Sequence, residues 1–107
     1  MRYVTPLDVT SPKDAVSNIR LILDQGAEGI SVAQIDWYEE PILVMRWNVS
    51  LREWDDPEKI SEENICLGMP VSRGYPVWFV IPEDFLDRNS ELWKNIKIGL
   101  EQLNKTK

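Results

Sequence analysis

Two short segments carry the residue types best suited to bind an anion. Arg46-Trp47-Asn48 lies in a stretch with strand character, and Ser72-Arg73-Gly74-Tyr75 lies in the loop before the most apolar run of the chain. Guanidinium groups bind carboxylates and phosphates through paired hydrogen bonds, and amides and hydroxyls add further polar contacts. The candidate binding residues are Arg46, Trp47, Asn48, Ser72, Arg73, Tyr75 and Asp36. The alternative is that Arg46 pairs with Asp36 while Arg73 lies exposed in a turn.

The chain has no histidine and one cysteine, which removes several kinds of catalytic chemistry. Triads and dyads that depend on histidine are excluded, and so are zinc sites built from Cys and His ligands. Cys66 lies between Ile65 and Leu67, so we expect it to be buried as a small apolar residue with no catalytic role. We therefore expect no metal, no cofactor and no catalytic residue, although carboxylate chemistry stays open.

Six acidic residues between positions 53 and 63 form a second candidate site. Their spacing lacks the glycine and the alternating ligands of a calcium-binding loop, so a solvated acidic face is favoured over a cation site. The alternative is a surface for a basic partner. Trp54 lies in the same segment, and it is either a binding residue or a side chain folded over the sheet edge. The acidic residues are Glu53, Asp55, Asp56, Glu58, Glu62 and Glu63.

Length and composition indicate one globular domain spanning 1–107. Hydrophobic residues make up 43% and charged residues 28%, values typical of a packed fold. The net charge of −6 is divided evenly, at −3 for residues 1–50 and −3 for the remainder. Neither half is basic, so nucleic acid is an unlikely partner. No apolar run reaches membrane-spanning length and none resembles a signal peptide, so we expect a cytoplasmic protein with no membrane partner.

Residue patterns predict the elements that position these side chains. Ser11, Pro12 and Gly26 are typical helix-end residues, and apolar positions spaced by three and four predict a helix over 12–25. Residues 30–50 predict a β-hairpin. We favour a three-residue loop, Glu39-Glu40-Pro41, because that register gathers the large apolar residues on one face and places Arg46 on the polar face beside Gln34 and Asp36.

The C-terminal half predicts one strand and two helices. The run 77–81 is apolar throughout and flanked by prolines, which favours a buried central strand. Asp56 and Pro57 predict a short helix reaching position 64, and the apolar stripe Trp93, Ile96, Leu100 and Leu103 predicts a helix over 90–104. The expected fold class is α+β: a small, mostly antiparallel sheet of the hairpin 30–50 and strand 77–81, with an additional edge strand at 2–5, packed with helices 12–25 and 90–104.

These features favour a small noncatalytic binding or protein-interaction module. Its expected partner is another protein or an anionic small ligand, and it could form a homodimer. The alternatives are an enzyme that uses Asp36, Arg46 and Arg73, and a binder of single-stranded nucleic acid that uses Arg46, Trp47, Arg73 and Tyr75. An interaction module should expose an apolar patch, whereas an enzyme should bring its charged residues together in a pocket.

Overall fold

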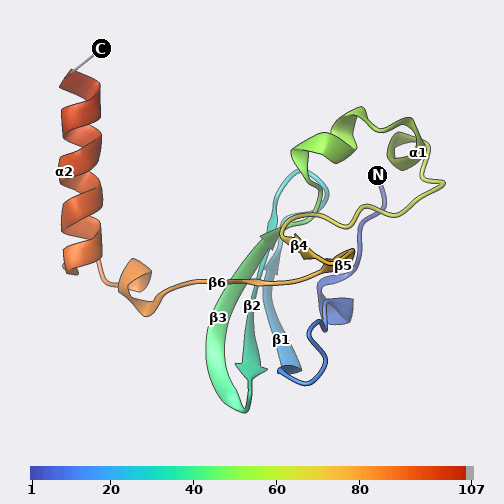
Figure 1. The fold of residues 1–107 in the computed structure, drawn as a ribbon, viewed down its shortest axis with the longest axis horizontal. Coiled ribbons are helices and arrows are strands. Elements are labelled where there is room, and N and C mark those ends of the chain that lie inside the picture. The colour runs from blue at the N-terminus through green and yellow to red at the C-terminus, as the bar shows by residue number, and fades with distance from the viewer. Residues whose placement is uncertain (106–107) are drawn as a thin grey trace.

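A four-stranded antiparallel sheet forms the centre of the molecule (Figure 1). The computed structural model describes residues 1–105. The strands are β1 (Val16–Asp24), β2 (Ile30–Trp37), β3 (Glu40–Trp47) and β6 (Phe79–Val80), in that spatial order. A separate two-stranded sheet joins β4 (Val71–Ser72) to β5 (Tyr75–Pro76). Together with a C-terminal helix, these sheets confirm the predicted α+β class.

The segment predicted as a helix over 12–25 is strand β1, so that prediction was wrong. β1 pairs with β2, but its register shifts twice, between Ser17 and Arg20 and between Leu21 and Leu23. Such bulges interrupt the alternation of side chains between the two faces of a strand. The apolar residues therefore fall at three- and four-residue intervals, which imitate the period of an amphipathic helix.

The hairpin over 30–50 is confirmed, but its predicted loop was wrong. Trp37 pairs with Glu40, so the loop contains only Tyr38 and Glu39. Their φ angles are 47° and 70°. Two-residue hairpin loops adopt this left-handed conformation because it matches the twist of the strands.

In the observed register, Arg46 and Trp47 lie on the opposite faces of the sheet from those predicted. Arg46 lies opposite Ser31 on the inner, buried face of the sheet, whereas Trp47 lies on the outer face. Asp36 is opposite Pro41 on that outer face, away from Arg46. The predicted position of Arg46 beside Gln34 and Asp36 was therefore wrong, because the large apolar residues of this hairpin are divided between both faces.

The core lies between the inner face of the sheet and two coil segments. The N-terminal segment, with the short 3-10 helix η1 (Pro6–Asp8), contacts β1, and the indole N–H of Trp78 donates to the carbonyl of Val9 at 2.8 Å. Burying apolar groups from these segments against the sheet removes them from water. The buried cluster comprises Val9, Val16, Ala33, Ile35, Val44 and Trp78.

Two predicted strands differ from the structure. The run 77–81 contains the short edge strand β6, in which Phe79 and Val80 are 55% and 45% exposed, so a buried central strand was wrong. Residues 2–5 form no edge strand, since Tyr3 makes only a single parallel bridge with Cys66. The predicted short helix is α1 (Pro57–Ile60), which ends well before position 64.

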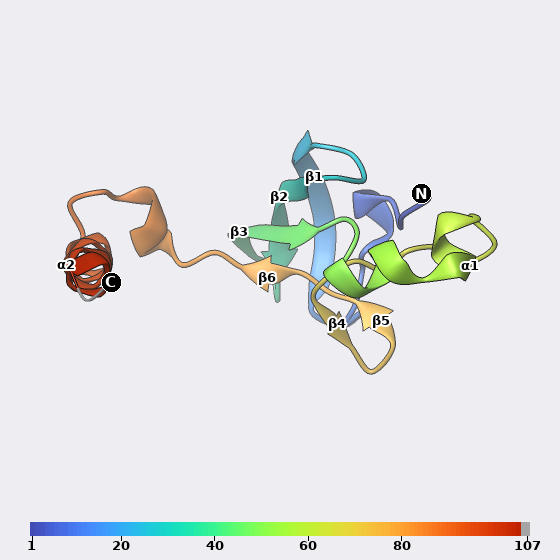
Figure 2. The same cartoon turned by 90° about the horizontal axis from the view of Figure 1, so that it is seen from above.

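The predicted C-terminal helix is confirmed as α2 (Glu91–Lys105), but its predicted packing on the sheet was wrong. Figures 1 and 2 show α2 standing apart from the strands at the end of an extended segment. Its main neighbour is the short 3-10 helix η3 (Glu83–Leu86). No residue of α2 is buried, so the outer face of the sheet lacks the helix that the sequence pattern led us to expect.

Candidate functional site

Arg46 is a buried structural residue. Only 2% of its surface is exposed, and its guanidinium donates to the backbone carbonyls of Leu67, Pro70 and Val77. Burial lowers the pKa of Arg46 to about 10, while the negative charge of Glu53 acts in the opposite direction. Because its hydrogen bonds are directed at the protein's own backbone, Arg46 joins strand β3 to the segment 67–77.

Glu53 also binds the segment 67–77, through backbone N–H groups. It lies in the 3-10 helix η2 (Leu51–Asp55) and is 8% exposed. Its carboxylate accepts hydrogen bonds from the backbone N–H groups of Leu67 at 2.7 Å and Gly68 at 2.9 Å, and forms an ion pair with Lys59 at 3.2 Å. Burial favours the neutral acid, but backbone bonds from Ser50, Leu67 and Gly68 outweigh it and lower the pKa of Glu53.

Gly68 allows the segment 67–77 to lie directly against β3. Its φ is +71°, and a Cβ atom there would lie 2.9 Å from the carbonyl oxygen of Asn48 and nearer still to that of Trp47. Trp47 and Met69 consequently exchange two backbone hydrogen bonds, at 2.8 Å and 3.1 Å. The close approach places the exposed side chains of Trp47 and Met69 next to each other.

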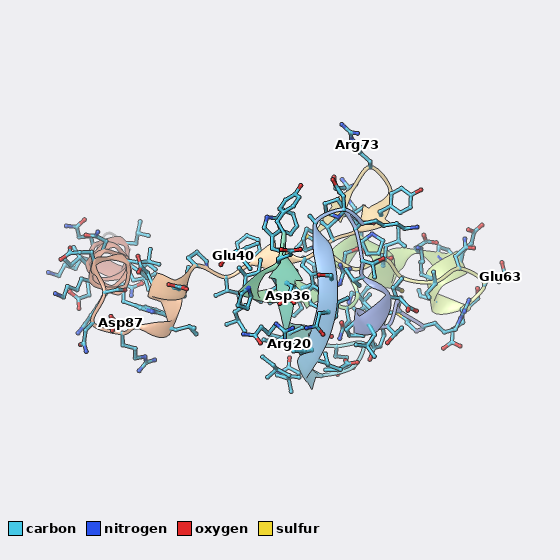
Figure 3. All side chains as sticks on the ribbon, turned by 90° about the horizontal axis from the view of Figure 1, so that it is seen from below. Arg20, Asp36, Glu40, Glu63, Arg73 and Asp87 are labelled. Carbon is cyan, nitrogen blue, oxygen red and sulfur yellow. The ribbon has the colours of Figure 1, made fainter. Side chains whose placement is uncertain are left out.

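Asp36 belongs to a separate cluster on the outer face of β1 and β2 (Figure 3). Arg20 forms an ion pair with Asp36 at 2.9 Å, and the Asn18 amide donates to the same carboxylate at 3.2 Å. The hydrogen bonds from Arg20 and then Asn18 lower the pKa of Asp36. Asp36 therefore pairs with Arg20 and not with Arg46, which the sequence analysis had considered as its partner. The sequence analysis overlooked Arg20.

The predicted residues of the 72–75 loop lie on the β4–β5 hairpin. Arg73 and Gly74 form its turn, with φ of 52° and 82°, and Figure 3 shows Arg73 pointing outward at the tip. Tyr75 is 63% exposed, and Ser72 lines a depression beside Trp78. Because the Arg46 guanidinium is buried against backbone carbonyls, the two arginines do not converge on a common ligand position.

Asn48 is also engaged within the protein. Its side-chain amide donates to Asp24 at 3.0 Å and to the Gly26 carbonyl at 2.8 Å, and its oxygen accepts from Ser31 at 2.7 Å. Asn48 therefore fixes the loop between β1 and β2. Of the seven predicted site residues, four are exposed to solvent: Trp47, Ser72, Arg73 and Tyr75.

Exposed apolar side chains gather around Trp47. Trp47 and Met69 are 46% and 50% exposed, and two shallow cavities of about 390 Å³ and 260 Å³ share these two residues. The first cavity extends towards the edge strand β6, and the second extends along η2. We call this region the Trp47 surface, and it consists of Met45, Trp47, Leu51, Trp54, Met69 and Phe79.

The start of η2, at Ser50 and Glu53, was indicated by the sequence. Ser50 and Glu53 have the Ser-x-x-Glu spacing of a helix start, which predicts that the carboxylate bonds back to the Ser50 N–H, as it does at 2.9 Å. This signal was available and was missed. Trp54 is 37% exposed at the edge of the second cavity, so it contributes to an accessible surface.

The sole thiol is buried, and the acidic side chains of the described residues form no metal-binding group. Cys66 is fully buried and unpaired, as predicted, and burial raises the pKa of its thiol, with the charge of Glu53 acting in the same direction. Among residues 1–105, no group of three or more Cys, Asp or Glu side chains is arranged to hold a metal ion. Within the same range, no helix is long and apolar enough to cross a membrane.

Comparisons of the chain with protein-family models, with curated proteins and with solved structures found no match.

Proposed function

We propose that the protein is a noncatalytic interaction module that binds an apolar segment of a protein chain on the Trp47 surface. The main supporting observation is the contrast between its polar and apolar residues. The polar side chains form hydrogen bonds within the protein, as seen for Arg46, Asn48 and Glu53. In contrast, about half of the surface of Trp47 and of Met69 is exposed. Large exposed apolar patches are typical of interaction sites.

The construction of the surface supports the same function. Trp and Met are both common in binding surfaces, Trp because it buries a large area and Met because its flexible side chain adapts to different partners. The Met69 backbone is held through its two bonds to Trp47, and the preceding residues are held by Glu53. A pre-positioned surface loses less conformational entropy when it binds. The single buried cysteine favours action in a reducing compartment such as the cytoplasm.

A displayed library of random short peptides provides a direct test. Selection against the intact protein should yield peptides with large apolar side chains, and Trp47→Asp should weaken their binding at least about tenfold. Tyr75→Asp is the matched control, because Tyr75 is exposed on the β4–β5 hairpin outside the Trp47 surface. Calorimetric titration measures both affinities, and circular dichroism verifies folding. Peptides that bind parent and Trp47→Asp equally, or a selection with no binder, would refute the proposed function.

A further inference from the structure

The C-terminal region forms an arm that is fixed at its elbow. The Trp93 indole donates to the Phe85 carbonyl at 2.7 Å, and the two rings pack edge to face with centroids 5.5 Å apart. Ser90 also donates to the Asp84 carbonyl at 2.9 Å. These contacts join η3 to the first turn of α2. The arm leaves the sheet at Ile81, whose N–H donates to Leu43 of β3, and the elbow directs α2 away from its own strands (Figure 1).

Helix α2 has an apolar surface but little tertiary support. Leu100, on the same side of the helix as Trp93 and Ile96, is 56% exposed, and no residue of the helix is buried. A cavity of about 490 Å³ lies along the arm, where Trp93, Ile96 and Leu100 alternate with Lys94 and Lys97. A helix of 15 residues is marginally stable in water by itself, and amphipathic helices gain most of their stability by packing an apolar face. The apolar face of the helix is therefore open to packing against another surface.

Net charge favours contact of α2 with the sheet region of another molecule over contact with a second α2. Residues 1–87 contain seven basic and sixteen acidic residues, a net charge of −9, whereas residues 88–105 contain four basic and two acidic residues, a net charge of +2. Pairing α2 with the same helix of another molecule would bring Arg88, Lys94 and Lys97 near their own copies. Contact with the acidic sheet region of another molecule instead places opposite charges together.

The outer face of the sheet has a suitable size and composition. Trp47 and Phe79 expose 46% and 55% of their surfaces there, and Met45 lies between them on β3. A 15-residue helix is roughly 22 Å long, and the eight residues of β3 span roughly 27 Å. The helix can therefore lie along the exposed strand without extending beyond it.

We infer that two copies of the chain associate by exchanging arms, with α2 of each copy lying on the outer face of the other's sheet. This inference rests on the proposed function, because it assigns the apolar segment bound at the Trp47 surface to a second copy of the same chain. Each copy has one α2 arm and one open sheet face. In a two-fold dimer each arm covers the face of the other copy, so no arm or face is left over for a third copy.

Analytical ultracentrifugation of the full chain tests the stoichiometry. The parent should sediment as a dimer, and Leu100→Asp on the arm or Phe79→Asp on the face should each weaken dimerisation at least about tenfold by removing an apolar contact. Gln102→Asp adds the same charge to a polar position of α2 and should leave the dimer intact. Circular dichroism and urea unfolding verify that each variant is folded. A monomeric parent, or dimers that resist both variants, would overturn the inference.

Disulfide trapping tests which surfaces meet. A chain carrying Leu100→Cys is mixed under mild oxidation with a chain carrying Phe79→Cys, while Gln102→Cys serves as the control. Rapid mixed cross-linking supports arm exchange. Preferential cross-linking of Leu100→Cys chains to one another would show that the helices pair. A third chain carries both Leu100→Cys and Phe79→Cys, and an intramolecular disulfide in it would show that α2 covers its own sheet. Either result overturns the exchange. Peptide binding that depends on Trp47 can persist in a monomer, so failure of the dimer and failure of the proposed function are distinguishable.

Discussion

Arg46 and Glu53 are the charged residues buried within the described part of the chain, and both bind backbone. Arg46 donates to the Leu67 carbonyl, while Glu53 accepts from the Leu67 and Gly68 N–H groups. The two side chains thus satisfy opposite polar groups of one segment, which would otherwise be costly to bury. Their effect on function is indirect, because they fix the backbone that presents Met69 beside Trp47.

Glu53→Gln should reduce stability in a pH-dependent way. The carboxylate has a lowered pKa in the folded state, so its contribution is complete above the ordinary value of 4.5 and is lost as pH falls through the folded value. At neutral pH we expect a loss of about 1.5–3 kcal/mol, because charged hydrogen bonds are replaced by weaker ones. The difference between parent and variant should shrink below pH 4.5.

Urea unfolding across this pH range measures the difference, and Glu63→Gln is the control because Glu63 is exposed on the neighbouring loop (Figure 3). A gap between parent and Glu53→Gln that stays constant from neutral pH into acid would contradict the proposed role of the ionised carboxylate.

Sequence reasoning named Trp47 and Arg46 as candidate binding residues but could not assign their environments. The observed pairing differs from the predicted one by three residues, because a 39–41 loop would place Tyr38 opposite Ile42 whereas the structure places Ile35 there. A shift by an odd number of residues exchanges the two faces of a strand, so Arg46 and Trp47 exchanged faces. Arg46 was assigned to the polar face by the predicted register, yet its carbonyl partners come from residues about twenty to thirty positions away in sequence. Long-range backbone partners of this kind leave no local pattern.

The elements show the same division between local and tertiary information. The final helix was predictable from its apolar spacing, and the hairpin from its β-branched and aromatic residues. β1 was not, because its two bulges remove the strand period and a Ser-Pro pair imitates a helix start. The apolar run at 77–81 was also misleading, since continuous apolar residues predict burial on both sides, whereas β6 is an edge strand with an uncovered outer face.

β6 provides a prediction at the element scale, because its flanking Trp78 and its own Phe79 point to opposite sides. Trp78 is 9% exposed and bonds to Val9, so Trp78→Ala should cost about 3–5 kcal/mol of unfolding free energy. Phe79→Ala should cost less than about 1 kcal/mol, since Phe79 is 55% exposed. Urea titration at concentrations where the chain is monomeric measures both values. Equal losses for the two variants would place Phe79 in the core and contradict the observed faces.

At the scale of the whole molecule, charge and apolar surface are divided between two bodies. Both halves of the sequence have the same net charge, so a comparison of halves does not show this division. The change from acidic to basic lies near residue 88, at the arm, and not at the middle of the chain. The sheet region is acidic with one open apolar face, and the arm is basic with one open apolar helix. The two bodies therefore have opposite net charges and each has an open apolar surface, and α2 stands apart from the strands of its own chain (Figure 1).

The helicity of α2 should depend on protein concentration for this reason. In a monomer, the helix is supported mainly by η3 and by the Trp93 contacts at its first turn, so it should fray from its C-terminal end and melt gradually below the unfolding temperature of the sheet. Association should restore the helix by burying Leu100 and its apolar neighbours. Far-UV circular dichroism should therefore show a helical signal that rises with concentration in the parent and in Gln102→Asp, but stays low in Leu100→Asp. A helical signal that is independent of concentration in all three, with a single sharp melting transition, would show that α2 is stable without a second copy.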